Sequence, residues 1–60
     1  MPLTLAPNLP DPDGFYDDLL RAHAGLSDAE SAAFNARLIL ILANHIGDPE
    51  TLRAALLAAR

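Results

Sequence analysis

The chain has 60 residues, a formal net charge of −4 at pH 7 and a hydrophobic content of 52%. The negative charge argues against a surface for nucleic acid or for anionic membranes, because the phosphates of both would repel it. The hydrophobic content is too high for a disordered chain, and the absence of cysteine excludes disulfides and thiolate metal sites. One domain of this length is near the lower limit for independent folding, so association with another chain is expected.

Residues 1–10, "MPLTLAPNLP", predict an extended N-terminal arm, because the three prolines fix φ and remove backbone donors. Leu3, Leu5 and Leu9 lie between these prolines. One interpretation is a frayed terminus. The other is an arm whose leucines bind a partner chain or a second copy of the protein.

A first helix is predicted over residues 12–24. Asp11 is a good N-cap, Pro12 suits the first helical position, and Gly25 is placed to end the helix. Asp17 and Arg21 are four residues apart on the solvent side and are expected to form a weak ion pair.

A second, longer helix is predicted over residues 28–46. The stretch "LSDAE" is a capping box, with Ser27 as N-cap and Glu30 as the third helical residue. Gly47 is expected to end the helix.

A third helix is predicted over residues 49–59, because Asp48 and Pro49 repeat the start signal of the first helix. The predicted fold is all-α: one small three-helix domain over residues 11–60, built as a helical hairpin plus a C-terminal helix, after the extended arm.

The predicted second helix has two apolar faces. Helical residues follow one another at about 100°, which separates these faces. One face is a seam rich in small side chains, and the first helix is expected to fill it. This seam comprises Ala32, Ala36, Ile39, Ala43 and Ile46. The other face carries Phe34, Leu38, Ile41 and Leu42, interrupted by Ser31, Asn35 and His45. Two apolar faces require either enclosure by the other two helices or cover from another polypeptide, and the second alternative is favoured.

The candidate interface residues come from this second face and from the arm: Phe34, Asn35, Leu38, Ile41, Leu42, His45, Leu3, Leu5 and Leu9. The polar residues Asn35, Arg37, Asn44 and His45 have two interpretations. They are either solvent-exposed or placed to set the register of a partner chain.

No pattern for catalysis, cofactor binding or metal binding is present. His23 and His45 lie on different predicted helices and lack a metal-ligand spacing, so a hydrogen-bonded or interfacial histidine is the ordinary interpretation. The three glycines are isolated and form no phosphate loop. We therefore expect a protein that is not an enzyme and has neither a cofactor nor a metal.

The stretch "GLSDAESAAFNARLILILANHIGD", with "FYDDLLRAH" before it and "LRAAL" after it, resembles a family of very short bacterial proteins known as a domain of unknown function. The resemblance extends from about residue 13 to residue 60, and "NARLILILANHIGD" is its most specific part. It implies an accessory subunit of a larger bacterial enzyme, with a flavin-dependent hydroxylase of aromatic catabolism as the candidate, and it transfers no catalytic residues.

The expected function is therefore a non-catalytic protein–protein interaction module, with a larger enzyme subunit as partner. The alternative is a self-associating helical homodimer. Without a signal peptide or a membrane-spanning apolar run, a cytoplasmic location is expected.

Overall fold

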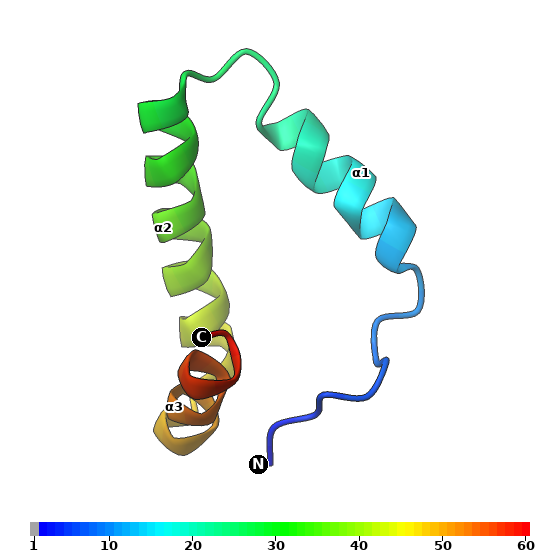
Figure 1. The fold of residues 1–60 in the computed structure, drawn as a ribbon, viewed down its shortest axis with the longest axis vertical. Helices are drawn as coiled ribbons and strands as arrows, with labels where there is room; N and C mark the ends of the chain where they lie inside the picture. The colour runs from blue at the N-terminus through cyan, green and yellow to red at the C-terminus, as the bar shows by residue number, and fades with distance from the viewer. Residues whose placement is uncertain (1) are drawn as a thin grey trace.

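The structure is a computed structural model that describes residues 2–60. It contains three α-helices, α1 (Pro12–Ala22), α2 (Asp28–Ile46) and α3 (Pro49–Ala58), shown in Figure 1. No strand occurs among the described residues. The all-α prediction is confirmed, and only the C-terminal ends of α1 and α3 differ from the predicted bounds.

Each helix begins at a short polar side chain that accepts a hydrogen bond from the backbone N–H three residues further on. These N-caps are Asp11, Ser27 and Asp48. The capping box predicted for α2 is complete. The N–H of Glu30 donates to Ser27 Oγ at 3.2 Å, and the N–H of Ser27 donates to Glu30 Oε1 at 2.9 Å. These caps satisfy backbone donors that a helix start would otherwise leave unpaired.

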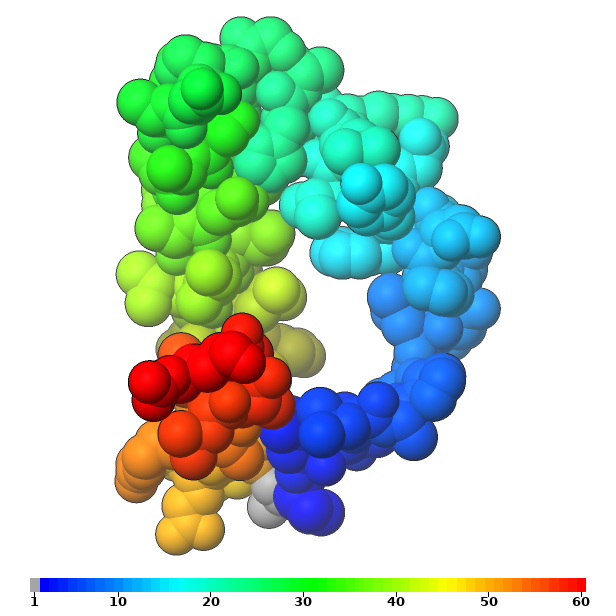
Figure 2. Space-filling view, viewed as in Figure 1, coloured from blue at the N-terminus to red at the C-terminus, as the bar shows by residue number. Residues whose placement is uncertain are grey.

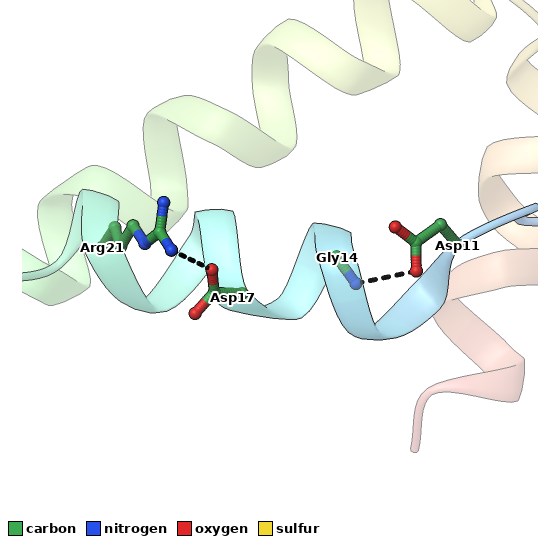
Figure 3. Close-up of polar contacts among 4 residues, drawn as sticks. All are labelled: Asp11, Gly14, Asp17 and Arg21. Atoms are coloured by element: carbon green, nitrogen blue, oxygen red, sulfur yellow. Dashed lines mark hydrogen bonds and ion pairs between the residues drawn. The ribbon is translucent and has the colours of Figure 1, made fainter.

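The start of α1 also explains a glycine. Asp11 Oδ1 accepts a hydrogen bond from the N–H of Gly14 at 3.1 Å, as Figure 3 shows. A Cβ atom at position 14 would lie 2.1 Å from the Asp11 carboxylate. Glycine therefore allows the capping side chain to approach the first turn.

The C-terminal end of α1 comes two residues earlier than predicted. The helix ends at Ala22 with His23 as C-cap, and Gly25 takes a positive φ of 80° in the turn that follows. The N–H of Leu26 donates to the carbonyl of His23 at 3.1 Å, which closes this turn. Gly25 does adopt the left-handed conformation, but within this turn rather than directly after the helix.

The helices form an open arrangement. From the turn at Gly25, α1 and α2 diverge, whereas Gly47, with φ of 73°, directs α3 across the far end of α2 (Figure 1). The arm leads away from α1 and returns toward the end of the molecule that holds α3. Within residues 2–60, no two helices pack along their lengths. Figure 2 shows the space between α1 and α2 still open with side chains drawn.

The described residues contain no buried apolar side chain, and Thr51 is the one buried residue among them. The accessible surface is 5196 Å². A compact monomer of this mass exposes about 3,800 Å². The chain thus keeps about 1,400 Å² in solvent that a folded protein of its size would cover.

Enclosure of α2 by α1 and α3 is not what the structure shows. Ile39, Leu40 and Ile41 are 63%, 69% and 65% exposed. Their side chains point to different sides of the helix, so both of its faces are open to solvent.

Candidate protein interaction surface

An apolar groove lies in the angle between α2 and α3. We call it the α2–α3 groove; its lining residues are Ile39, Leu40, Leu42, Ala43, Ile46, Leu52, Ala55, Leu56 and Ala59. Every one of these side chains is a hydrocarbon, so the groove offers no hydrogen-bonding group or charge to a substrate. It suits the apolar face of another polypeptide segment.

Two spacings in the sequence build this groove. On α2 the residues at 39, 43 and 46 follow one another at four and three positions, and on α3 those at 52, 55, 56 and 59 do the same. This spacing places each set along one side of its helix. The turn at Gly47 brings the two sides to face each other, and the alanines among them leave room for another helix to approach.

A basic border lies beside the groove on α3. Arg53 and Arg60 line a shallow hollow together with Leu56 and Leu57. Neither arginine forms an ion pair with another described residue. Their guanidinium groups are therefore open to carboxylates of an incoming chain.

His23 connects the end of α1 to α2. Its Nδ1 lies 2.9 Å from Ser31 Oγ, and its Nε2 lies 3.0 Å from Asn35 Oδ1. Because the amide oxygen can only accept, Nε2 carries the proton and donates to Asn35. The imidazole also meets the ring of Phe34 edge-to-face at 4.8 Å. A hydrogen-bonded histidine was the ordinary interpretation for this position, and the structure confirms it.

Carboxylates at two helix starts have lowered pKa values. The backbone N–H of Ser27, and then its hydroxyl, lower the pKa of Glu30 by hydrogen bonding. The hydroxyl of Thr51 donates to the Asp48 carboxylate and holds the pKa of that group down. In both cases the first cause is a hydrogen bond that stabilises the charged carboxylate at the start of a helix.

The structure distributes the predicted interface residues over several environments. Phe34 and Asn35 contact His23 of the same chain, and Leu38 on that face is half-buried. The others on α2, Ile41, Leu42 and His45, are exposed. In the arm, Leu3 is half-buried, whereas Leu5 and Leu9 are exposed. Of all nine predicted residues, Leu42 alone lines the α2–α3 groove.

The sequence interpretation missed the groove itself. It treated the seam with Ile39, Ala43 and Ile46 as internal core to be filled by the first helix. The structure instead holds the end of α1 on the side of Ser31 and Asn35, and it leaves the seam facing α3 and solvent. The alternation of small and large residues on both helices was the signal that could have indicated a docking surface.

Among residues 2–60, no group of three or more His, Asp or Glu side chains is arranged to hold a metal ion. The described helices include none with the length and apolarity needed to cross a membrane. The candidate interaction site among the described residues is therefore the apolar groove with its basic border.

Fold and surface together define a small all-α protein whose helices present apolar side chains outward. The model of a family described as "Protein of unknown function (DUF2783)" matches residues 3–60. The chain belongs to this family, which confirms the expected membership in a family of short uncharacterised proteins. No curated protein and no solved structure matches the chain.

Proposed function

We propose that this protein is a non-catalytic helical interaction module that completes its hydrophobic core with another polypeptide chain. One observation carries the proposal: the described chain buries no apolar side chain, yet it has an all-apolar groove. Burial of apolar surface is the main favourable term in folding, so three helices that fully bury no apolar side chain need cover from elsewhere.

The setting we propose is that of an accessory subunit of a larger bacterial enzyme in the cytoplasm. This part rests on the sequence: the resemblance implies such a subunit, with a flavin-dependent hydroxylase as the candidate, and the chain lacks cysteine. The lack of any polar side chain in the groove supports a binding role over a catalytic one.

Two neighbouring leucines on α3 give a matched test. Leu56 and Leu57 are each 68% exposed, but only Leu56 lines the α2–α3 groove. We expect Leu56→Asp to abolish association, because it places a carboxylate in an apolar contact. Leu57→Asp should weaken association less, because its carboxylate lies in the shallow hollow with Arg53 and Arg60 rather than in the apolar groove. Sedimentation velocity and binding of an apolar dye would measure the effect.

The wild-type protein gives the second test. An assembled protein should show cooperative melting that is lost on dilution, because association contributes to its stability. A monomer that melts cooperatively at every concentration, and binds no apolar dye, would disprove the proposal. Equal effects of the two aspartate substitutions would also count against the groove.

A further inference from the structure

The helix α1 has the properties of a ligand for the α2–α3 groove. Phe15, Tyr16 and Leu20 are exposed on one side of it. At about 100° per residue, Asp17 and Asp18 point away from this side, and Asp13 lies next to Leu20 at its edge. As Figure 3 shows, Asp17 is already paired with Arg21, at 2.6 Å, which leaves Asp13 and Asp18 as the other carboxylates of this helix.

The groove complements this helix in shape and in charge. It is apolar throughout, and its border carries Arg53 and Arg60. The lengths also agree, since α1 has 11 residues and α3 has 10, about 16 Å and 15 Å. An acidic amphipathic helix therefore matches an apolar groove with a basic edge.

The protein's own α1 is directed elsewhere. Its end is fixed by the bonds from His23 to Ser31 and Asn35. On α2, these contacts are centred about 65° away from the groove residues Ile39, Ala43 and Ile46. The groove is thus left for a helix from another chain.

The exposed area is large enough for a second copy to be that chain. Two separate copies expose twice 5196 Å². A compact particle of double the mass exposes about 6,300 Å², so dimer formation would cover about 4,100 Å² in total. This lies in the range of obligate homodimers, about 2,000–5,000 Å².

We infer that the α2–α3 groove of each copy receives α1 of a second copy, in a reciprocal two-fold dimer. Phe15, Tyr16 and Leu20 enter the partner's groove, and Asp13 and Asp18 face Arg53 and Arg60. The two contacts are equivalent and related by the two-fold axis, so the assembly closes at two chains. The inference rests on the proposed function and identifies a second copy of the protein as the chain that covers the groove.

A charge exchange tests it. One variant carries Arg53→Glu and Arg60→Glu, and the other carries Asp13→Arg and Asp18→Arg. Each alone opposes like charges at both contacts and should dimerise about tenfold more weakly than the wild type. Mixed together they match at both contacts, because each groove then meets a helix of opposite charge. We expect a mixed dimer in native mass spectrometry, with affinity close to that of the wild type.

The control replaces Arg37, which lies outside the groove, by Glu. Mixed with the Asp13→Arg, Asp18→Arg variant, it should give at most a partial recovery, because only one of the two contacts then joins opposite charges. Absence of recovery in the first mixture, or equal recovery in the control, overturns the exchanged dimer. A wild-type monomer that binds apolar dye also overturns it but leaves the proposed function standing with a different partner. A cooperatively folded, dye-free monomer removes both.

Discussion

At the scale of single residues, Ser27 and Glu30 control where α2 begins. Their two reciprocal hydrogen bonds satisfy donors at the first turn of the longest helix. Replacing Ser27 by Ala should lower the free energy of unfolding by about 1 kcal/mol, a typical effect for loss of an N-cap. Glu30→Ala should have a smaller effect. Thermal melts at one fixed protein concentration would rank the two, and the opposite order would place the start of α2 elsewhere.

Glu30 also makes the stability of the folded protein depend on pH. Its pKa in the folded protein lies below the usual value of 4.5, because the N–H of Ser27 donates to the carboxylate. The stabilisation is therefore fully present above pH 4.5 and is lost as the pH falls through the lowered pKa. Glu30→Gln keeps an acceptor oxygen without the titration. Its melting temperature should fall less than that of the wild type between pH 5 and pH 3, and parallel decreases would refute this role for Glu30.

At the scale of elements, one imidazole joins the end of α1 to α2. His23→Ala removes the bonds to Ser31 and Asn35 together with the ring contact to Phe34. Since hydrogen bonds of this kind each contribute about 1 kcal/mol, the end of α1 should separate from α2 while both helices persist. Amide exchange should become faster over residues 19–26 and stay unchanged in α3. Unchanged exchange throughout would mean that the turn alone holds α1 in place.

The elements themselves were predictable, whereas their arrangement was not. Caps such as Ser27 and turn residues such as Gly47 act on neighbours three or four positions away, so the local sequence identifies them. The contacts of His23 join positions 8 and 12 residues apart and depend on side-chain geometry. Assignment of the seam to the internal core failed for the same reason: periodicity identifies an apolar face but does not say what covers it.

At the scale of the whole molecule, the arm is the part without regular structure. Residues 2–11 form neither helix nor strand, and Leu5 is 76% exposed. A leucine contributes about 1.5–3 kcal/mol when fully buried, so the three arm leucines are expected to bind within the assembly. Deleting residues 2–10 should weaken association and lower the melting temperature by several degrees.

A matched variant separates the leucines from the length of the arm. It carries Ser at positions 3, 5 and 9 and keeps all three prolines. This variant should reproduce the effect of the deletion in melting and in sedimentation. If both variants associate and melt like the wild type, the arm is only a solvated tail.

The openness of the chain has a consequence for its amount in a cell. A polypeptide that is covered only within a complex spends its unbound time with backbone and leucine side chains accessible to proteases. Cleavage of such open forms follows their population, which mass action lowers as the binding chain becomes more abundant. Copies that remain unassembled would be degraded first. The lifetime of this protein would then increase with the fraction of it that is assembled.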